Sequence, residues 1–104
     1  MPKTIKKPVL KKKMDTKNTR FLVTGGSGSF GRSIIKKLLS LGAEHIVSIS
    51  RNEDLIRQAR REITSPFVSF KLGDITDRAM IENIMKEIDV VFHAAAIKHV
   101  SLAE

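Results

Sequence analysis

A glycine-rich segment between an apolar run and an amphipathic stretch constrains this chain more than any other feature. Residues 24–31 read Thr-Gly-Gly-Ser-Gly-Ser-Phe-Gly. They follow the wholly apolar run 21–23, which is typical of a strand buried on both faces. Apolar residues then recur at helical spacing (positions 30, 34, 35, 38 and 39) until Gly42, which predicts the end of a helix. The segment is therefore expected to turn the chain tightly from a buried strand into a helix.

The same alternation continues along the chain. Further strands are predicted over residues 46–49, 67–72 and 90–92. Asn52 is expected to cap a second helix, and either Thr76 or Asp77 a third. The third helix is expected to bury its apolar side chains Met80, Ile81, Ile84, Met85 and Ile88. The order β-α-β-α-β-α-β predicts an α/β fold with a parallel, Rossmann-like sheet in strand order 3-2-1-4, the incomplete half of a doubly wound fold.

In this context the glycines predict a dinucleotide-binding turn. Gly25 lets the chain turn sharply off the strand, Gly28 lets a pyrophosphate approach the backbone, and Gly31 lets the helix pack closely on the sheet. The free N–H groups of the helix N-terminus then face the anion. Ser27 and Ser29 can add hydroxyl donors.

The ends of the following strands indicate which dinucleotide is bound. Arg51 follows the second strand, where an NAD site usually has a carboxylate, and its guanidinium suits a 2′-phosphate. We therefore expect NADP, with NAD the less favoured alternative. After the third strand, Asp74 and Ile75 are placed to contact adenine, and the small residue Ala94 lets the cofactor cross the sheet edge. The simpler alternatives are a surface arginine, a turn aspartate and close helix packing.

The net charge of +8 is concentrated at one end of the chain. Residues 1–20 carry eight basic residues and one acidic residue, whereas the remainder carries eleven and ten, so the body is nearly neutral. Residues 1–18 are interpreted as a disordered basic arm, with Met14 an alternative start. No aromatic residue is interleaved with its lysines, so we expect no nucleic-acid partner, although a nucleic-acid or membrane tether through residues 1–17 is a third hypothesis.

Several residue types and patterns are absent from the sequence. The chain contains no Cys, which excludes disulfides and Cys-ligated zinc and fits a cytoplasmic location. It contains no Tyr, so it cannot itself supply a tyrosine phenol. The three histidines show no metal-ligand spacing, so no metal site is expected, and no apolar run approaches the length of a membrane span.

Taken together, these motifs resemble a known family. The glycine segment, the Gly-Asp-Ile-x-Asp string at 73–77 and the His-Ala-Ala-Ala-Ile-Lys-His-Val string at 93–100 are similar to extended short-chain dehydrogenases/reductases. The narrower resemblance is to CapD-like polysaccharide biosynthesis proteins, which include inverting UDP-N-acetylglucosamine 4,6-dehydratases, and it covers residues 19–104. It implies a homo-oligomeric enzyme that moves a hydride from C4 of a UDP-sugar to C6 through bound NADP and eliminates water.

The resemblance also implies a set of cofactor-binding residues. By this resemblance, residues of the glycine turn contact the pyrophosphate, and residues that follow the second strand contact the 2′-phosphoribose. Residues of the 93–100 string lie beside the nicotinamide half. Together with the adenine pair and Ala94, the full set is Gly25, Ser27, Gly28, Ser29, Phe30, Gly31, Arg51, Asn52, Asp74, Ile75, Ala94, Ala95 and Lys98. In this chain Asn52 stands where the family commonly has Asp, and Ser101 where it commonly has Pro.

Family members carry their catalytic Tyr and Lys after a fifth strand. We therefore expect residues 19–104 to be the N-terminal part of an NAD(P)-binding domain that is inactive alone. The alternative that the sequence leaves open is a non-catalytic dinucleotide-binding module, which the lack of Tyr favours if the chain is complete.

Overall fold

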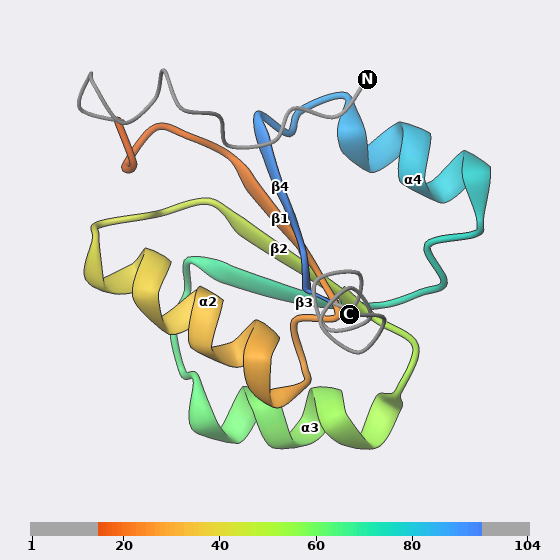
Figure 1. Ribbon diagram of the computed structural model, residues 1–104, viewed down its shortest axis with the longest axis horizontal. Helices are drawn as coiled ribbons and strands as arrows, with labels where there is room; N and C mark the ends of the chain where they lie inside the picture. Colours follow the sequence, from red (N-terminus) through yellow and green to blue (C-terminus); the bar gives the residue numbers. More distant parts are fainter. Residues whose placement is uncertain (1–14, 95–104) are drawn as a thin grey trace, which may run out of the picture.

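The computed structural model describes residues 15–94, which fold into alternating strands and helices (Figure 1). The elements are β1 (Phe21–Thr24), α2 (Ser29–Ser40), β2 (Ile46–Ser50), α3 (Glu53–Glu62), β3 (Val68–Leu72), α4 (Arg78–Met85) and β4 (Val90–His93). Each predicted element is present, and each strand differs from its predicted range by one residue at one end. The predicted alternation is confirmed.

The four strands form one parallel sheet in the order β3-β2-β1-β4. On β1, Phe21 pairs with Ile46 of β2 and with Val90 of β4, and Thr24 pairs with His93. The chain thus runs outward from β1 to β3 and then returns across the sheet to place β4 on the other side of β1. The predicted strand order is confirmed, and the carboxyl ends of all four strands lie at the same edge.

The core lies between the sheet and the helices α2 and α3, which cover one face (Figure 1). Phe21, Val23, Ile35 and Ala59 are fully buried in it. Both helices direct their apolar stripes at this face, because residues spaced by three or four lie on one side of a helix. This packing holds the N-terminal end of α2, which directly follows the glycine segment, at the carboxyl edge of the sheet.

Helix α4 lies on the opposite face and is less buried than the sequence predicts. Met80, Ile81, Ile84, Met85 and Ile88 are all half-buried, and no residue of α4 is fully buried. The physical reason is that α4 covers only part of this face. Ser69 and Lys71, which alternate with the buried Phe70 and so point to the α4 face, are exposed.

The helix ends follow the sequence signals. The side chain of Asn52 accepts a hydrogen bond from the backbone N–H of Leu55, and Asp77 caps α4 by accepting from the N–H of Met80. Of the two predicted caps for α4, the structure therefore selects Asp77. Gly42 follows α2 with a φ of 95°, the left-handed conformation that glycine adopts at helix C-termini.

Of the predicted basic arm over residues 1–18, only residues 15–18 fall within the described part of the chain. These four residues form a turn, in which Asp15 accepts hydrogen bonds from Asn18 Nδ2 (2.9 Å) and, at its carbonyl, from the hydroxyl of Thr19 (2.6 Å). None of the helices within residues 15–94 is long and apolar enough to cross a membrane.

Candidate functional site

A cleft of about 300 Å³ opens at the carboxyl edge of the sheet. All four strands contribute to it, either with a terminal residue or with the loop that follows, and its lining comprises Thr24, Gly25, Ile49, Ser50, Arg51, Gly73, Asp74, Ile75, Thr76 and His93. Open parallel sheets bind ligands outside the carboxyl ends of their strands, where the strand order reverses. In this chain the reversal lies between β1 and β4, so the cleft occupies the expected position.

A larger hollow of about 480 Å³ lies at the amino edge, between β2, β3 and α4. Arg20, Phe67 and Lys86 are among its lining residues. It contains no part of the glycine segment and no helix N-terminus, so it lacks the backbone N–H donors that bind a pyrophosphate in a dinucleotide site. We therefore assign the functional site to the smaller cleft.

The glycine segment forms the turn that the sequence predicts. Gly25 has a φ of 73°, a conformation that side-chain-bearing residues rarely adopt, and its N–H donates to the Ile49 carbonyl at 2.8 Å. A Cβ on Gly31 would lie only 2.5 Å from Cα of Gly26, so the start of α2 approaches the turn backbone closely. These two glycines determine the shape of the turn.

Gly28 differs from them because nothing in the fold requires a glycine there. Its φ of −76° and ψ of 171° suit any residue, and an added Cβ would meet only the Gly25 carbonyl oxygen, at an ordinary 3.6 Å. Gly28 is also the N-cap of α2, and no side chain in the described part of the chain caps that helix. The first-turn N–H groups, which have no intrahelical acceptor, therefore face an approachable surface.

Gly26 is a structural residue to which the sequence analysis assigned no role. A Cβ at this position would lie 3.0 Å from Cβ of Ser48 and 3.1 Å from Cδ1 of Ile35. The glycine therefore lets the turn sit directly on β2 and α2. Its place immediately after the turning Gly25, beside a fully buried strand, is the sequence signal that could have identified it.

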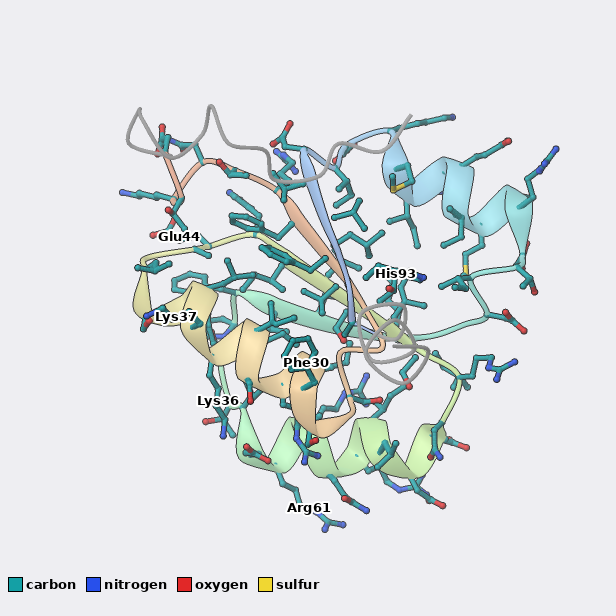
Figure 2. All side chains as sticks on the ribbon, in the orientation of Figure 1. Phe30, Lys36, Lys37, Glu44, Arg61 and His93 are labelled. Carbon is teal, nitrogen blue, oxygen red and sulfur yellow. The ribbon has the colours of Figure 1, made fainter. Side chains whose placement is uncertain are left out.

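Ser27 and Ser29 occupy different environments. Ser27 is buried, and its hydroxyl donates inward to Oγ of Ser50 at 2.6 Å, which joins the glycine turn to the end of β2. Ser50 Oγ also accepts from the N–H of Asn52. Ser29 is exposed on the first turn of α2. The next residue, Phe30, is 46 % exposed (Figure 2). The hydroxyl available at the surface of the turn is therefore that of Ser29.

The strand ends bring two predicted site residues together. Arg51 Nη1 lies 3.6 Å from Oδ2 of Asp74, and Ile75 beside them is 41 % exposed. The pKa of Asp74 lies below its ordinary value. The main cause is the pair of hydrogen bonds donated by the backbone N–H and the hydroxyl of Thr76, and the positive charge of Arg51 contributes less. Asn52 is close in sequence, but its side-chain oxygen is engaged in capping α3.

His93 is a cleft residue that the sequence analysis left without a role. It ends β4 beside Thr24 on β1, and its Nδ1 shares a hydrogen bond with the buried hydroxyl of Thr24 (Figure 2). A histidine directly after a buried strand, at the binding edge of a parallel sheet, is the signal that would have identified it. Ala94 is 3 % exposed, and the predicted sites Ala95 and Lys98 lie outside the described residues. Residues 15–94 contain no cluster of three or more metal-ligating side chains.

Residues 21–104 match the family described as polysaccharide biosynthesis protein. This match covers the glycine turn, the cleft and every strand of the sheet. The chain belongs to this family. The predicted resemblance to polysaccharide biosynthesis proteins of the short-chain dehydrogenase/reductase type is confirmed.

Among the curated relatives of this chain, an uncharacterized membrane protein of Methanocaldococcus jannaschii is 40 % identical over 88 residues, which are 85 % of this chain and 26 % of that protein. The inverting UDP-N-acetylglucosamine 4,6-dehydratase of Campylobacter jejuni is 37 % identical, over 80 % of this chain and 25 % of its own. A UDP-glucose 4-epimerase of Rickettsia bellii is 36 % identical, over 80 % and 26 %. The chain thus spans about a quarter of the length of these relatives.

Among solved structures, the fold is similar to that of the enzyme WbmF of Bordetella bronchiseptica in complex with NAD⁺ and UDP. The TM-score is 0.60 with 29 % identity, and the matched region is 75 % of this chain and 23 % of that one. The comparison confirms the predicted parallel, Rossmann-like sheet for the family member described here.

Proposed function

We propose that this chain is the NADP-binding portion of a nucleotide-sugar dehydratase or epimerase of the UDP-N-acetylglucosamine 4,6-dehydratase type. NAD is the alternative cofactor. When bound, a nicotinamide dinucleotide supplies a hydride acceptor that can return the hydride. The role of the described residues is to bind and orient that cofactor at the carboxyl edge of the sheet.

The observation that carries the proposal is the uncapped N-terminus of α2 at Gly28. The side chains of Asn52 and Asp77 each accept from one first-turn N–H of α3 and α4, whereas α2 begins on a glycine, which has no side chain to accept from such a donor. A pyrophosphate provides the missing acceptors, and its negative charge suits the positive end of the helix dipole. The cleft includes Gly25 of the same turn and extends past the ends of β2 and β3, in the direction that an adenosine half would need.

The preference for NADP rests on Arg51. Its side chain is 76 % exposed at the rim of the cleft, where a ribose 2′-phosphate would gain a charge-assisted hydrogen bond. No carboxylate occupies the position directly after β2, because the chain reads Ser50-Arg51-Asn52 there. The complex of WbmF with NAD⁺ supports the broader class of cofactor.

The sugar substrate is proposed from the relatives. The Campylobacter jejuni relative is a UDP-N-acetylglucosamine 4,6-dehydratase, and the Rickettsia bellii relative is a UDP-glucose 4-epimerase. Both names specify a UDP-sugar, so a UDP-sugar is the substrate class proposed for the whole enzyme. Its self-association and a cytoplasmic location belong to the same proposal.

Calorimetric titration of the protein with NADP and with NAD tests the proposal. We expect NADP to bind more tightly, and Gly28→Val to lose both ligands while its unfolding transition is retained, because a Cβ at this position meets only the Gly25 carbonyl oxygen, at an ordinary 3.6 Å. Leu41→Ala, a change at the far, exposed end of α2, is the matched control and should bind as the parent does. Equal binding by Gly28→Val, or no binding of either dinucleotide by the parent, would overturn the proposal.

A further inference from the structure

The ion pair between Arg51 and Asp74 joins two groups that would meet different parts of the same ligand. Ser50 and Leu72 are paired on β2 and β3, so the loops that follow these strands emerge side by side. Arg51 comes from the first loop and Asp74 from the second, and their charged groups lie 3.6 Å apart at the rim of the cleft. A cofactor whose adenosine half enters the cleft would encounter this pair as a unit.

The orientation of the Asp74 carboxylate is fixed by its own loop. Oδ1 accepts from the backbone N–H of Thr76 at 2.9 Å and from its hydroxyl at 2.8 Å, and the other oxygen, Oδ2, is the one that faces Arg51. The same hydrogen bonds lower the pKa of Asp74, so the carboxylate is ionised at neutral pH. Arg51 is therefore held beside a fixed negative charge rather than standing alone.

We propose that Asp74 is a specificity-determining residue, which weakens the preference of Arg51 for a 2′-phosphate and so allows the site to accept NAD as well as NADP. The proposal rests on the dinucleotide-binding function proposed above. A 2′-phosphate carries close to two negative charges, so it is attracted to the guanidinium and repelled by the carboxylate behind it. The 2′-hydroxyl of NAD is uncharged and is little affected by either group.

The effect is expected to be moderate, because the pair is exposed to solvent. Both side chains are well over a third exposed, and water and salt screen charges at such positions. We expect removal of the carboxylate charge to raise the ratio of the NAD to the NADP dissociation constant about threefold. The change should be larger at low ionic strength and smaller in molar salt.

Asp74→Asn tests this directly. An asparagine can keep Oδ1 as the acceptor for both hydrogen bonds from Thr76, so the loop is preserved while the charge is lost. Asp77→Asn is the matched control, since it removes the same unit charge three residues away, from the cap of α4, and asparagine caps helices equally well. Arg51→Gln, alone and combined with Asp74→Asn, completes a double-mutant cycle.

The measurement is calorimetric titration of the parent and the four variants with NADP and NAD, and with adenosine 2′,5′-bisphosphate and 5′-AMP as probes of the adenosine half. The proposal is supported if Asp74→Asn raises the preference for the 2′-phosphate ligands and Asp77→Asn does not. It also requires that Arg51→Gln abolishes the preference for the 2′-phosphate ligands.

Equal weakening of both ligand classes by Asp74→Asn would overturn the proposal and assign Asp74 to adenine alone. A shift of the same size in Asp77→Asn would also overturn it, by showing a general charge effect. Absence of binding to any of these ligands by the parent would instead mean that the proposed function itself is wrong.

Discussion

Replacement of Gly28 by aspartate should stabilise the fold and abolish dinucleotide binding. Gly28 is the N-cap of α2, and its φ of −76° and ψ of 171° are accessible to aspartate without strain. The Asp77 side chain already caps α4 by accepting from a first-turn N–H. An aspartate at position 28 should do the same for α2, and so occupy the donors proposed to bind the pyrophosphate.

The size of the stabilisation can be estimated from three contributions. A capping carboxylate is better than glycine by a few tenths of a kcal/mol, and its charge at the helix N-terminus adds about 0.3–1 kcal/mol. Loss of glycine from the unfolded chain adds up to about 1 kcal/mol. Steric cost is small, since an added Cβ meets only the Gly25 carbonyl oxygen at 3.6 Å. The sum is about 1 kcal/mol, or roughly 4–8 °C in the unfolding midpoint of a chain of this size.

Urea unfolding followed by far-UV circular dichroism measures the first effect, and calorimetric titration with NADP and NAD the second. We expect a higher midpoint at unchanged slope together with loss of measurable binding. Gly28→Asn separates capping from charge, because asparagine caps equally well without adding a negative charge beside the phosphates. If Gly28→Asp is destabilised, or if it binds either dinucleotide as the parent does, the assignment of Gly28 to the ligand rather than to the fold is refuted.

Three further predictions concern the scaffold. Gly31→Ala should destabilise the chain by about 1–3 kcal/mol, because its Cβ would come within 2.5 Å of the Gly26 backbone; an unchanged denaturation midpoint would contradict this. Ile35→Ala should cost about 2–5 kcal/mol in the same assay, since Ile35 is fully buried under the sheet. The pKa of Glu62 is lowered, mainly by its hydrogen bond with Lys36 and then by the charges of Lys36 and Arg32. The ionised Glu62 carboxylate should therefore stabilise the fold above its ordinary pKa of 4.5, and this stabilisation should disappear as the pH falls through the lowered pKa. Denaturation curves of Glu62→Gln and of the parent should accordingly differ at pH 7 and converge in acid.

The element order and the strand order could be predicted because they depend on patterns that lie close together in the sequence. The run 21–23 contains no polar residue and so predicts a buried strand. Asn52 and Asp77 each precede the apolar stripe of a helix, and Gly42 follows the end of another such stripe. Each signal is local and each agrees with the global fold, which is the condition under which sequence patterns are reliable. The parallel connection then leaves few possible arrangements of the strands.

The side-chain partners could not be predicted, because they depend on how separate segments meet. The sequence makes Ser27 look like a phosphate ligand, yet the packing of the glycine turn on β2 directs its hydroxyl to Ser50. It likewise assigns Arg51 and Asp74 to different parts of a cofactor, whereas the register of β2 and β3 places them 3.6 Å apart. For α4, the apolar spacing predicts the inward side correctly but not how much of the face it covers, and its apolar residues remain half-buried.

The glycine turn shows how fold and function requirements can be separated within one short segment. Gly25 is needed for its φ of 73°, and Gly26 and Gly31 are needed because the space beside them is filled by other atoms. Those three positions restrict the sequence whether or not a ligand binds. Gly28 satisfies neither condition, and a capping residue there would improve the helix. At position 28 the chain therefore carries a residue that stabilises the helix less than a capping residue would. A ligand requirement explains this choice, and at Gly28 the ligand is an anion bound at the start of α2.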